Sequence, residues 1–342
     1  MQSMDNSAKG KDKRIKWVDL TKCVACLIVL TGHLLQGLVK AGIMQDSFGY
    51  GYANRMMYHV NIALFLICSG YLYQKYCHID SIKDYLKNLG NKAFRLLIPY
   101  VFFVTLSWGI KYFLRDKVNT QVDSLFHELF IKPMSPYWFL LTLFALFVIT
   151  PLIKGWRTLI IVNIEAVIIY LVIVSSHGVP YVVTLLTVVI WFVLGMDLAY
   201  LKVDEYVCGT EIRSHQVCRM VVSILLIIAF LFAGFMEYKK DIHIDVVHFM
   251  ISMLGCCGII CLDILICKMD DCLLLAKMSN YVMPVYLMHT MFSAGVRIIL
   301  TKLEISSLPI HLLLGFIVAI VGPAIVYEVW EKIYRKREGY YL

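Results

Sequence analysis

Four side chains that can take part in catalysis or binding are arranged at helical spacing near the start of the chain. Asp19, Lys22, Cys26 and His33 lie in an otherwise apolar run. At about 100° per residue they fall within about 60° of one another on one helix face. Lys22 and His33 are three helical turns apart, about 16 Å along the axis. An ammonium binds anionic oxygens as a point charge, and a desolvated imidazole can act as a general base. The spacing therefore favours chemistry on a long substrate with an anionic end.

A purely structural interpretation of the same residues is also available. Lys22 can extend its ammonium to a membrane interface, and His33 can be an interior residue held by hydrogen bonds. An ionisable side chain within a membrane span is costly without a use. The combination of His33 with Lys22 on one face therefore favours function.

A second histidine lies at the start of the next apolar run. His59 precedes a segment that ends in Ser69, Gly70 and Tyr71. If the two runs are antiparallel spans joined by a short loop, we expect His59 and His33 to lie together in the outer half of the bilayer. The alternatives are an interfacial histidine in an aromatic belt and a small-residue helix contact at Ser69 and Gly70.

Other polar residues leave more than one interpretation open. Arg95 starts a later apolar run, where it can bind an anion or simply anchor the span at the interface. Glu165 lies within a span, where it can line a cavity or pair with another helix. Cys23 and Cys26 form a C-x-x-C pair without a second pair or a histidine at zinc-like spacing. We therefore expect no metal site and no bound cofactor.

The composition shows that these residues must be positioned by membrane helices. Hydrophobic residues make up 60% of the chain and charged residues 16%, against about 45–50% and about 25% in soluble proteins. A span needs about 20 apolar residues. Together these features predict an all-α, polytopic membrane protein with a single bundle of about ten helices. The predicted spans are 18–40, 56–73, 93–114, 137–153, 157–176, 180–201, 218–236, 246–267, 280–300 and 307–332.

The basic residues predict the orientation of this bundle. Most of the 32 Lys and Arg residues fall in alternate loops on the side of the N-terminus, which is the positive-inside pattern. We therefore expect a multi-pass plasma-membrane protein with cytoplasmic basic tails at 1–17 and 333–342 around one domain at 18–332. Because the net charge of +8 comes from these short loops, nucleic-acid binding is excluded.

Five motifs in order along the chain resemble those of the acyltransferase-3 family. Residues 137–141 resemble its WFL motif, and residues 95–100 resemble its RLLIPY segment. The five motifs are Asp19-x2-Lys22-x10-His33, His59-x5-Phe65-x3-Ser69-Gly70-Tyr71, Arg95-Leu-Leu-Ile-Pro99-Tyr100, Tyr137-Trp138-Phe139-Leu140-Leu141 and Asn280-Tyr281-x4-Tyr286-Leu-Met-His289. Two departures stand out: Lys22 occupies a position where many members have arginine, and Val-Asn replaces the usual Met-Pro after His59.

The resemblance implies a membrane enzyme with ten or eleven helices. Such an enzyme moves an acyl group, usually acetyl, from cytosolic acyl-coenzyme A to a hydroxyl of a cell-envelope carbohydrate or glycolipid. Acyl-coenzyme A is a co-substrate, membrane lipid surrounds the protein, and a homo-oligomer is compatible with the pattern. The expected site has catalytic His33 and His59, donor-binding Lys22, Arg95 and Asp19, and acceptor-binding or cavity-lining Ser69, Tyr71, Trp138, Glu165, Tyr286 and His289.

Two further alternatives remain at this level. The first is a transient acyl-His33 intermediate in place of direct transfer. The second is a proton-coupled transporter or a flippase for a lipid-linked saccharide, because such proteins also carry intramembrane His, Glu and Asp residues. The sequence shows neither an inverted repeat nor matched spans interrupted by Gly and Pro, which many transporters have. We therefore expect the enzyme.

Overall fold

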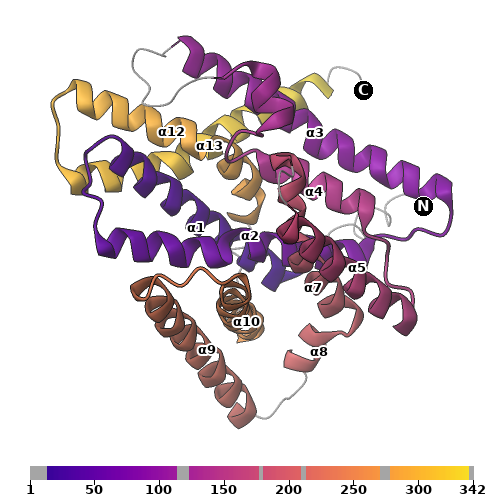
Figure 1. The fold of residues 1–342 in the computed structure, drawn as a ribbon. Helices are drawn as coiled ribbons and strands as arrows, with labels where there is room; N and C mark the ends of the chain where they lie inside the picture. Colours follow the sequence, from indigo (N-terminus) through magenta and orange to yellow (C-terminus); the bar gives the residue numbers. More distant parts are fainter. Residues whose placement is uncertain (1–13, 114–122, 177–179, 209–212, 270–277, 339–342) are drawn as a thin grey trace, which may run out of the picture.

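The chain forms a bundle of helices in the computed structural model, which describes residues 14–113, 123–176, 180–208, 213–269 and 278–338 (Figure 1). Within those ranges the regular elements are all helical. Their order is α1 (Lys16–Lys40), α2 (Phe48–Tyr76), α3 (Ile82–Phe113), η2 (His127–Ile131), α4 (Trp138–Ile149), α5 (Trp156–Ser175), α6 (Tyr181–Thr184), η3 (Leu185–Val188), α7 (Val189–Tyr200), α8 (Val203–Cys208), α9 (Arg213–Lys239), α10 (Asp245–Met269), η4 (Ser279–Tyr281), α12 (Val282–Lys302) and α13 (Leu308–Glu338).

The prediction of an all-α polytopic membrane protein is confirmed. Eight helices of the described chain are long and apolar enough to cross a bilayer, and each overlaps one of the predicted spans. They are α1, α2, α3, α5, α9, α10, the segment formed by η4 and α12, and α13.

The two remaining predicted spans are shorter than expected. The 12 residues of α4 extend only about 18 Å, against a hydrocarbon core of about 30 Å. Thr150 ends α4 in an extended conformation, as expected for a residue before proline, here Pro151. The predicted span 180–201 divides into α6, the 3₁₀ turn η3 and the 12-residue α7.

Helix α2 is the centre of the bundle. It packs against α1, α7, α9 and α10, while α1 also packs against α12 and α13. In Figure 1, α9 and α10 lie below α2, and α12 and α13 lie above α1. Helices α2 and α7 approach closely at two glycines. A Cβ atom at Gly70 would overlap the carbonyl oxygen of Phe192, and one at Gly195 would overlap that of Ile67.

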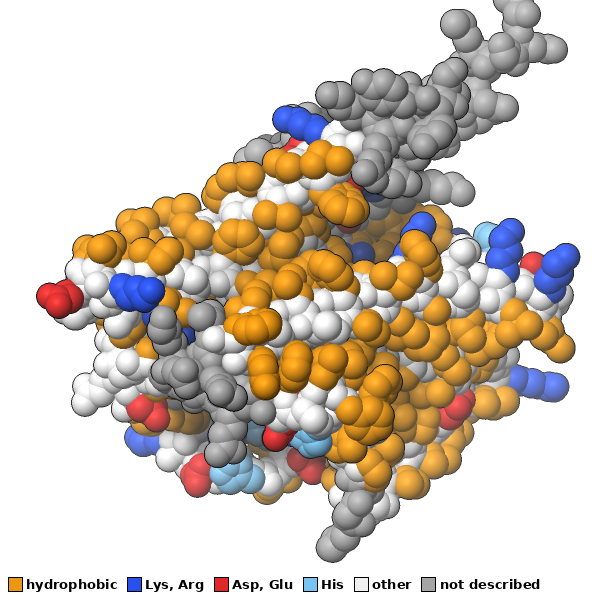
Figure 2. Space-filling model, turned by 90° about the horizontal axis from the view of Figure 1, so that it is seen from above, with side chains coloured by type: hydrophobic (Ala, Val, Ile, Leu, Met, Phe, Trp, Pro, Cys, Tyr) orange, Lys and Arg blue, Asp and Glu red, His pale blue; other side chains and the backbone are white. Residues whose placement is uncertain are grey.

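The outer surface of the bundle is apolar. In the membrane-spanning windows of α5 and α9 only 17% of residues are buried. The large hydrophobic side chains exposed on these helices include Ile160, Ile164, Leu171, Leu225, Ile228 and Phe232. Figure 2 shows hydrophobic side chains covering broad bands of one face, with Lys and Arg mostly toward its edges. Because lipid chains solvate such surfaces, this distribution fits a protein embedded in a bilayer.

Candidate functional site: a buried histidine pair and a group of cations

Helices α1 and α12 bring two imidazoles together inside the bundle. The ring centroids of His33 and His289 are 5.4 Å apart, and the ring planes are inclined by 40°. His289 is 1% exposed, and His33 is partly buried. From the sequence, His289 was expected in the cavity lining and His59 was expected as the partner of His33.

The hydrogen bonds of His289 indicate which ring nitrogen carries a proton. Its Nδ1 lies 2.8 Å from the carbonyl oxygen of Tyr286 and 3.0 Å from that of Val285. Because a carbonyl oxygen only accepts, Nδ1 must be the protonated nitrogen. Nε2 is buried and has no hydrogen-bond partner among the described residues. His289 therefore holds an unshared electron pair in the interior, beside the ring of His33.

An aromatic wall fixes α12 in this position. The Tyr286 hydroxyl donates to the carbonyl oxygen of Pro136 at 2.5 Å. Its ring lies 5.8 Å from that of Phe65 and 5.6 Å from that of Phe139. Trp138, beside Phe139 at the start of α4, is partly buried. The WFL motif and Tyr286 thus support the helix that carries His289.

Asp19, Lys22, Cys26 and His33 form a stripe on one face of α1. The end of this α1 stripe away from the histidine pair carries positive charge. Lys22 is partly buried, and both Lys22 and Arg95 act electrostatically on Lys92 of α3. The Lys92 ammonium also lies 4.3 Å from the centre of the Phe147 ring. The two cations predicted to bind the donor thus both lie within electrostatic range of Lys92, a third cation that the sequence analysis did not select.

Asp19 interacts with the segment that precedes α12. Its carboxylate accepts a hydrogen bond from Ser279 and lies close to Lys22 and Arg14. Arg14 also donates to the side chain of Asn280 at 2.6 Å. Asp19 therefore links α1 to η4 as well as approaching Lys22.

An apolar hollow lies along α1 between the cations and the histidine pair. It is bounded by Cys23, Cys26 and Leu27 of α1 and by residues of the α12 and α13 region. Cys26 belongs to the same helix face as Lys22 and His33. The stripe predicted from the sequence therefore has an open groove beside its middle part.

Ser69 and Tyr71 have structural contacts in the interior of the bundle. The Ser69 hydroxyl donates to the carbonyl oxygen of Phe65, four residues earlier in α2, at 2.7 Å. The hydroxyl of the fully buried Tyr71 donates to Asp204 at 2.5 Å and accepts from Lys75 at 2.8 Å. The Tyr71 contact with Asp204 connects α2 to α8, whereas the Ser69 contact stays within α2.

Glu165 lines a different hollow. This hollow lies between the end of α2, the start of α3 and helices α4 and α5, and its lining includes Tyr73, Tyr85 and Lys154. The prediction that Glu165 borders a cavity fits this placement. The hollow contains neither His33 nor His289 in its lining.

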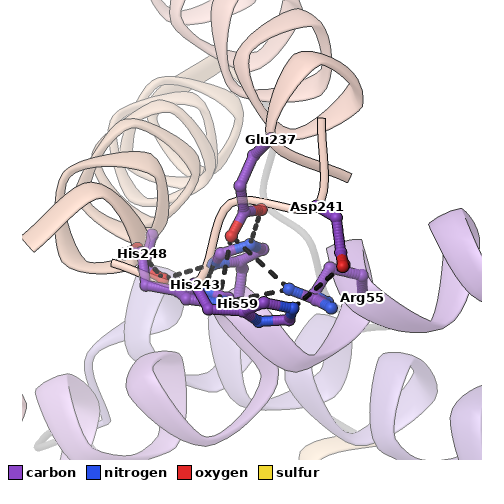
Figure 3. Close-up of polar contacts among 7 residues, drawn as sticks. Arg55, His59, Glu237, Asp241, His243 and His248 are labelled. Atoms are coloured by element: carbon purple, nitrogen blue, oxygen red, sulfur yellow. Dashed lines mark hydrogen bonds and ion pairs between the residues drawn. The ribbon is translucent and has the colours of Figure 1, made fainter. Parts of the chain in front are cut away.

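His59 belongs to a second polar cluster. Its Nδ1 is 2.9 Å from the Ser252 hydroxyl, and its Nε2 is 3.0 Å from Glu237. The His248 ring lies 4.6 Å from the His59 ring, centre to centre. Figure 3 shows His59, Glu237 and His248 converging from α2, α9 and α10, with Arg55 beside them. The expectation that His59 partners His33 is replaced by these contacts, since each ring has a different neighbour.

Three buried or partly buried polar residues were missed from the sequence. Asp263 was not selected from the sequence, but it is 4% exposed and accepts a hydrogen bond of 2.6 Å from Thr21. His248 was not selected from the sequence, and Glu237 fell just outside a predicted span, but both contact His59. Glu237 directly follows the apolar run 218–236, and His248 lies at the start of the apolar run 246–267; an ionisable side chain at such a position is the signal that could have identified them.

The fold and the histidine pair define a class: polytopic membrane proteins that carry an imidazole pair inside an all-helical bundle. Within that class, the model of a family described as an acyltransferase domain matches residues 15–328. The chain therefore belongs to the acyltransferase-3 family, and the resemblance inferred from its motifs is confirmed.

Two curated relatives share part of this sequence. Nodulation protein NolL of Mesorhizobium japonicum is 28% identical over 159 residues, which are 46% of this chain and 40% of that protein. NolL of Sinorhizobium fredii is 28% identical over 153 residues, which are 44% of this chain and 39% of that protein. The matches thus span about two fifths of the relatives' length. No solved structure matches the chain.

Proposed function

We propose that this protein is an integral membrane O-acyltransferase. It moves an acyl group, acetyl in the first instance, from acyl-coenzyme A to a hydroxyl of a cell-surface or lipid-linked carbohydrate. Family membership supports acyl transfer. The observation that carries the proposal is the pairing of His33 with His289, whose buried Nε2 holds an unshared electron pair.

The donor site is the cationic end of α1. Lys22, Lys92 and Arg95 attract the phosphates of coenzyme A. The pantetheine arm then passes along α1 beside Cys26, where a hollow is bounded by Cys23, Cys26 and Leu27, residues that lie between Lys22 and His33 in the sequence. The thioester reaches the histidine pair at the end of this path, about 16 Å from the phosphate site.

The chemistry is a proton-coupled acyl transfer. His33 removes the proton of the acceptor hydroxyl while the hydroxyl oxygen attacks the thioester carbonyl. The electron pair of His289 Nε2 stabilises the imidazolium that forms on His33. Collapse of the tetrahedral intermediate breaks the carbon–sulfur bond, and the departing thiolate takes the proton back from His33. The products are the O-acyl ester and free coenzyme A.

The same proposal includes an orientation. The cationic end of α1 faces the cytoplasm, where acyl-coenzyme A is made, and both chain termini lie on that side of the plasma membrane. The excess of basic residues in alternate loops supports this arrangement.

The test is thiol release from acetyl-coenzyme A by the purified protein in nanodiscs, with cell-envelope glycans as acceptors. We expect release by the wild-type protein and by His243→Ala, a control with an exposed loop histidine, and loss of release in His33→Ala. Release that is equal in His33→Ala would overturn the proposed site. Absence of release with acetyl-, propionyl- and succinyl-coenzyme A alike would favour saccharide transport instead.

A further inference from the structure

A second site lies away from the histidine pair, where α2, α9 and α10 meet. His59, Glu237 and His248 each offer one ligand atom there, and these atoms lie within 4.8 Å of one another. The side chains of His59 and Glu237 are almost completely buried, whereas that of His248 is 34% exposed. The acyl-transfer proposal gives this cluster no role, and the ligand chemistry of the cluster does not depend on that proposal.

The hydrogen bonds around His59 place an unshared electron pair on its Nε2. The Ser252 hydroxyl donates its proton to the carbonyl oxygen of His248 at 2.9 Å. A hydroxyl has one proton, so Ser252 must accept at its 2.9 Å contact with His59 Nδ1. Nδ1 is therefore the protonated nitrogen, and in the neutral ring Nε2 carries the electron pair. That atom faces Glu237 Oε2 at 3.0 Å.

The same reasoning applies to His248. Its Nε2 lies 3.3 Å from a guanidinium nitrogen of Arg55. Because arginine only donates, His248 Nε2 accepts in the neutral ring, and it also faces Glu237 Oε1 at 3.0 Å. The Nδ1 atoms of His248 and His59, which lie 3.4 Å apart, then both carry protons and share no hydrogen bond. Glu237 Oε1 is buried without a hydrogen-bond partner among the described residues. Three electron-pair donors thus converge at one point, an arrangement that a cation would stabilise.

From this geometry we propose that His59, Glu237 and His248 bind a divalent metal ion of the zinc class. Two imidazoles and one carboxylate with a fourth position open are a ligand set that zinc accepts. Bonds of about 2.0–2.1 Å in a tetrahedral site separate ligand atoms by about 3.3 Å. The separations of 3.0 Å from His59 Nε2 to Glu237 Oε2 and from His248 Nε2 to Glu237 Oε1 differ from that value by a few tenths of an ångström. The ligand atoms all lie within 4.8 Å of one another, so the widest separation must shorten by up to about 1.5 Å when the ion binds.

Ser252 supports this assignment from outside the ligand set. A metal-binding histidine commonly donates its second N–H to an oxygen that fixes the ring orientation. Ser252 occupies that position for His59 and directs Nε2 toward Glu237. The serine is in turn anchored to the backbone of His248, the third ligand.

The Arg55 guanidinium competes with the proposed metal ion for the position beside the Glu237 carboxylate. One guanidinium nitrogen lies 3.6 Å from Glu237 Oε1, and the side chain is 25% exposed. The guanidinium also lies 5.7 Å from the centre of the Tyr238 ring. When a metal ion binds, Arg55 must move away from Glu237, and the exposed side of the cluster gives it room. The guanidinium and the metal ion therefore exclude one another.

The test uses full-length protein without a histidine tag, purified in nanodiscs, stripped with a chelator and titrated with Zn²⁺ against a chromogenic chelator. We expect one equivalent to bind to the wild-type protein and a Co²⁺ absorption spectrum typical of tetrahedral coordination. His59→Gln, Glu237→Gln and His248→Gln should each lose this equivalent. Ser252→Ala should lower the affinity by about 10–100-fold.

Two further variants keep the test decisive if a ligand variant fails to fold. Arg55→Gln removes the competing charge and should bind Zn²⁺ more tightly than the wild-type protein. His243→Gln, in the neighbouring loop and paired with Asp241, should bind as the wild-type does. The proposal is overturned if neither wild-type nor Arg55→Gln binds Zn²⁺, which would make the cluster an ion pair. It is equally overturned if His243→Gln alone loses the metal.

Discussion

His33 and His289 lie with their ring centroids 5.4 Å apart although one belongs to α1 and the other to α12. The contact is specific in its chemistry, because the backbone carbonyls of Val285 and Tyr286 fix the proton of His289 on Nδ1. His289 Nε2 is therefore the ring nitrogen whose electron pair can accept a hydrogen bond.

This arrangement predicts different results for two substitutions of the pair. His33→Ala removes the proposed base and should lower kcat by about 10²–10⁴-fold, the usual contribution of a general base. His289→Gln lacks the imidazole electron pair and should lower kcat less, with the KM for acetyl-coenzyme A unchanged in both variants. Steady-state thiol release measures both constants. A large rise in KM with normal kcat would place the pair in substrate binding.

The cation group predicts a defect in donor binding. Loss of one hydrogen bond to a charged group costs about 1.5–3 kcal/mol, so Lys22→Ala and Lys92→Ala should each raise the KM for acetyl-coenzyme A by about 10–150-fold. Lys22→Arg should retain binding, because a guanidinium grips phosphate with two donors. Lys154→Ala, at an exposed pair with Asp80, is the control. Equal effects at Lys154 would indicate general attraction by the surface charge.

The close approach of α2 and α7 predicts a loss of stability. Gly70→Ala and Gly195→Ala insert a methyl group against backbone carbonyls and should each lower the free energy of unfolding by about 1–3 kcal/mol. Gly109→Ala is the matched control, since its added Cβ would meet no atom within 4 Å beyond its chain neighbours and its own helix backbone. It should be neutral or slightly stabilising, as alanine favours helix. Thermal unfolding in detergent compares the three variants.

The buried bond between Thr21 and Asp263 predicts a second stability effect. Thr21→Val leaves the Asp263 carboxyl without its donor and should lower the free energy of unfolding by about 1–3 kcal/mol. Thr21→Ser keeps the hydroxyl and should lose much less. Denaturation curves of the two variants separate the hydrogen bond from the methyl group. Equal losses would assign the effect to packing.

The spans and the α1 stripe could be predicted because both depend on local sequence. Apolar runs reveal helices directly, and the spacing of Lys22, Cys26 and His33 puts them on one face whatever the neighbours are. The short α4 was harder, because the apolar run continues past Thr150, while the helix stops before Pro151. The hydrophobic composition of a segment does not predict the residue at which the helix ends.

The pairing of histidines could not be predicted in the same way. Antiparallel neighbours α1 and α2 do pack together, and Gln36 contacts Asn54 and Tyr58 across them. However, the rotation of each helix about its axis decides which side chains meet. In this structure His59 faces α9 and α10, and His33 faces α12. The rotation depends on contacts between helices that are distant in sequence.

The position of the histidine pair also has a consequence for biogenesis. α1 precedes, and α12 follows, nearly all the other described helices. During synthesis, His33 therefore enters the membrane long before His289 is translated. The imidazole pair can assemble only when α12 has been inserted and has docked against α1. A nascent or truncated chain without α12 would hold only His33, so a partly made copy in the membrane would lack the proposed catalytic pair.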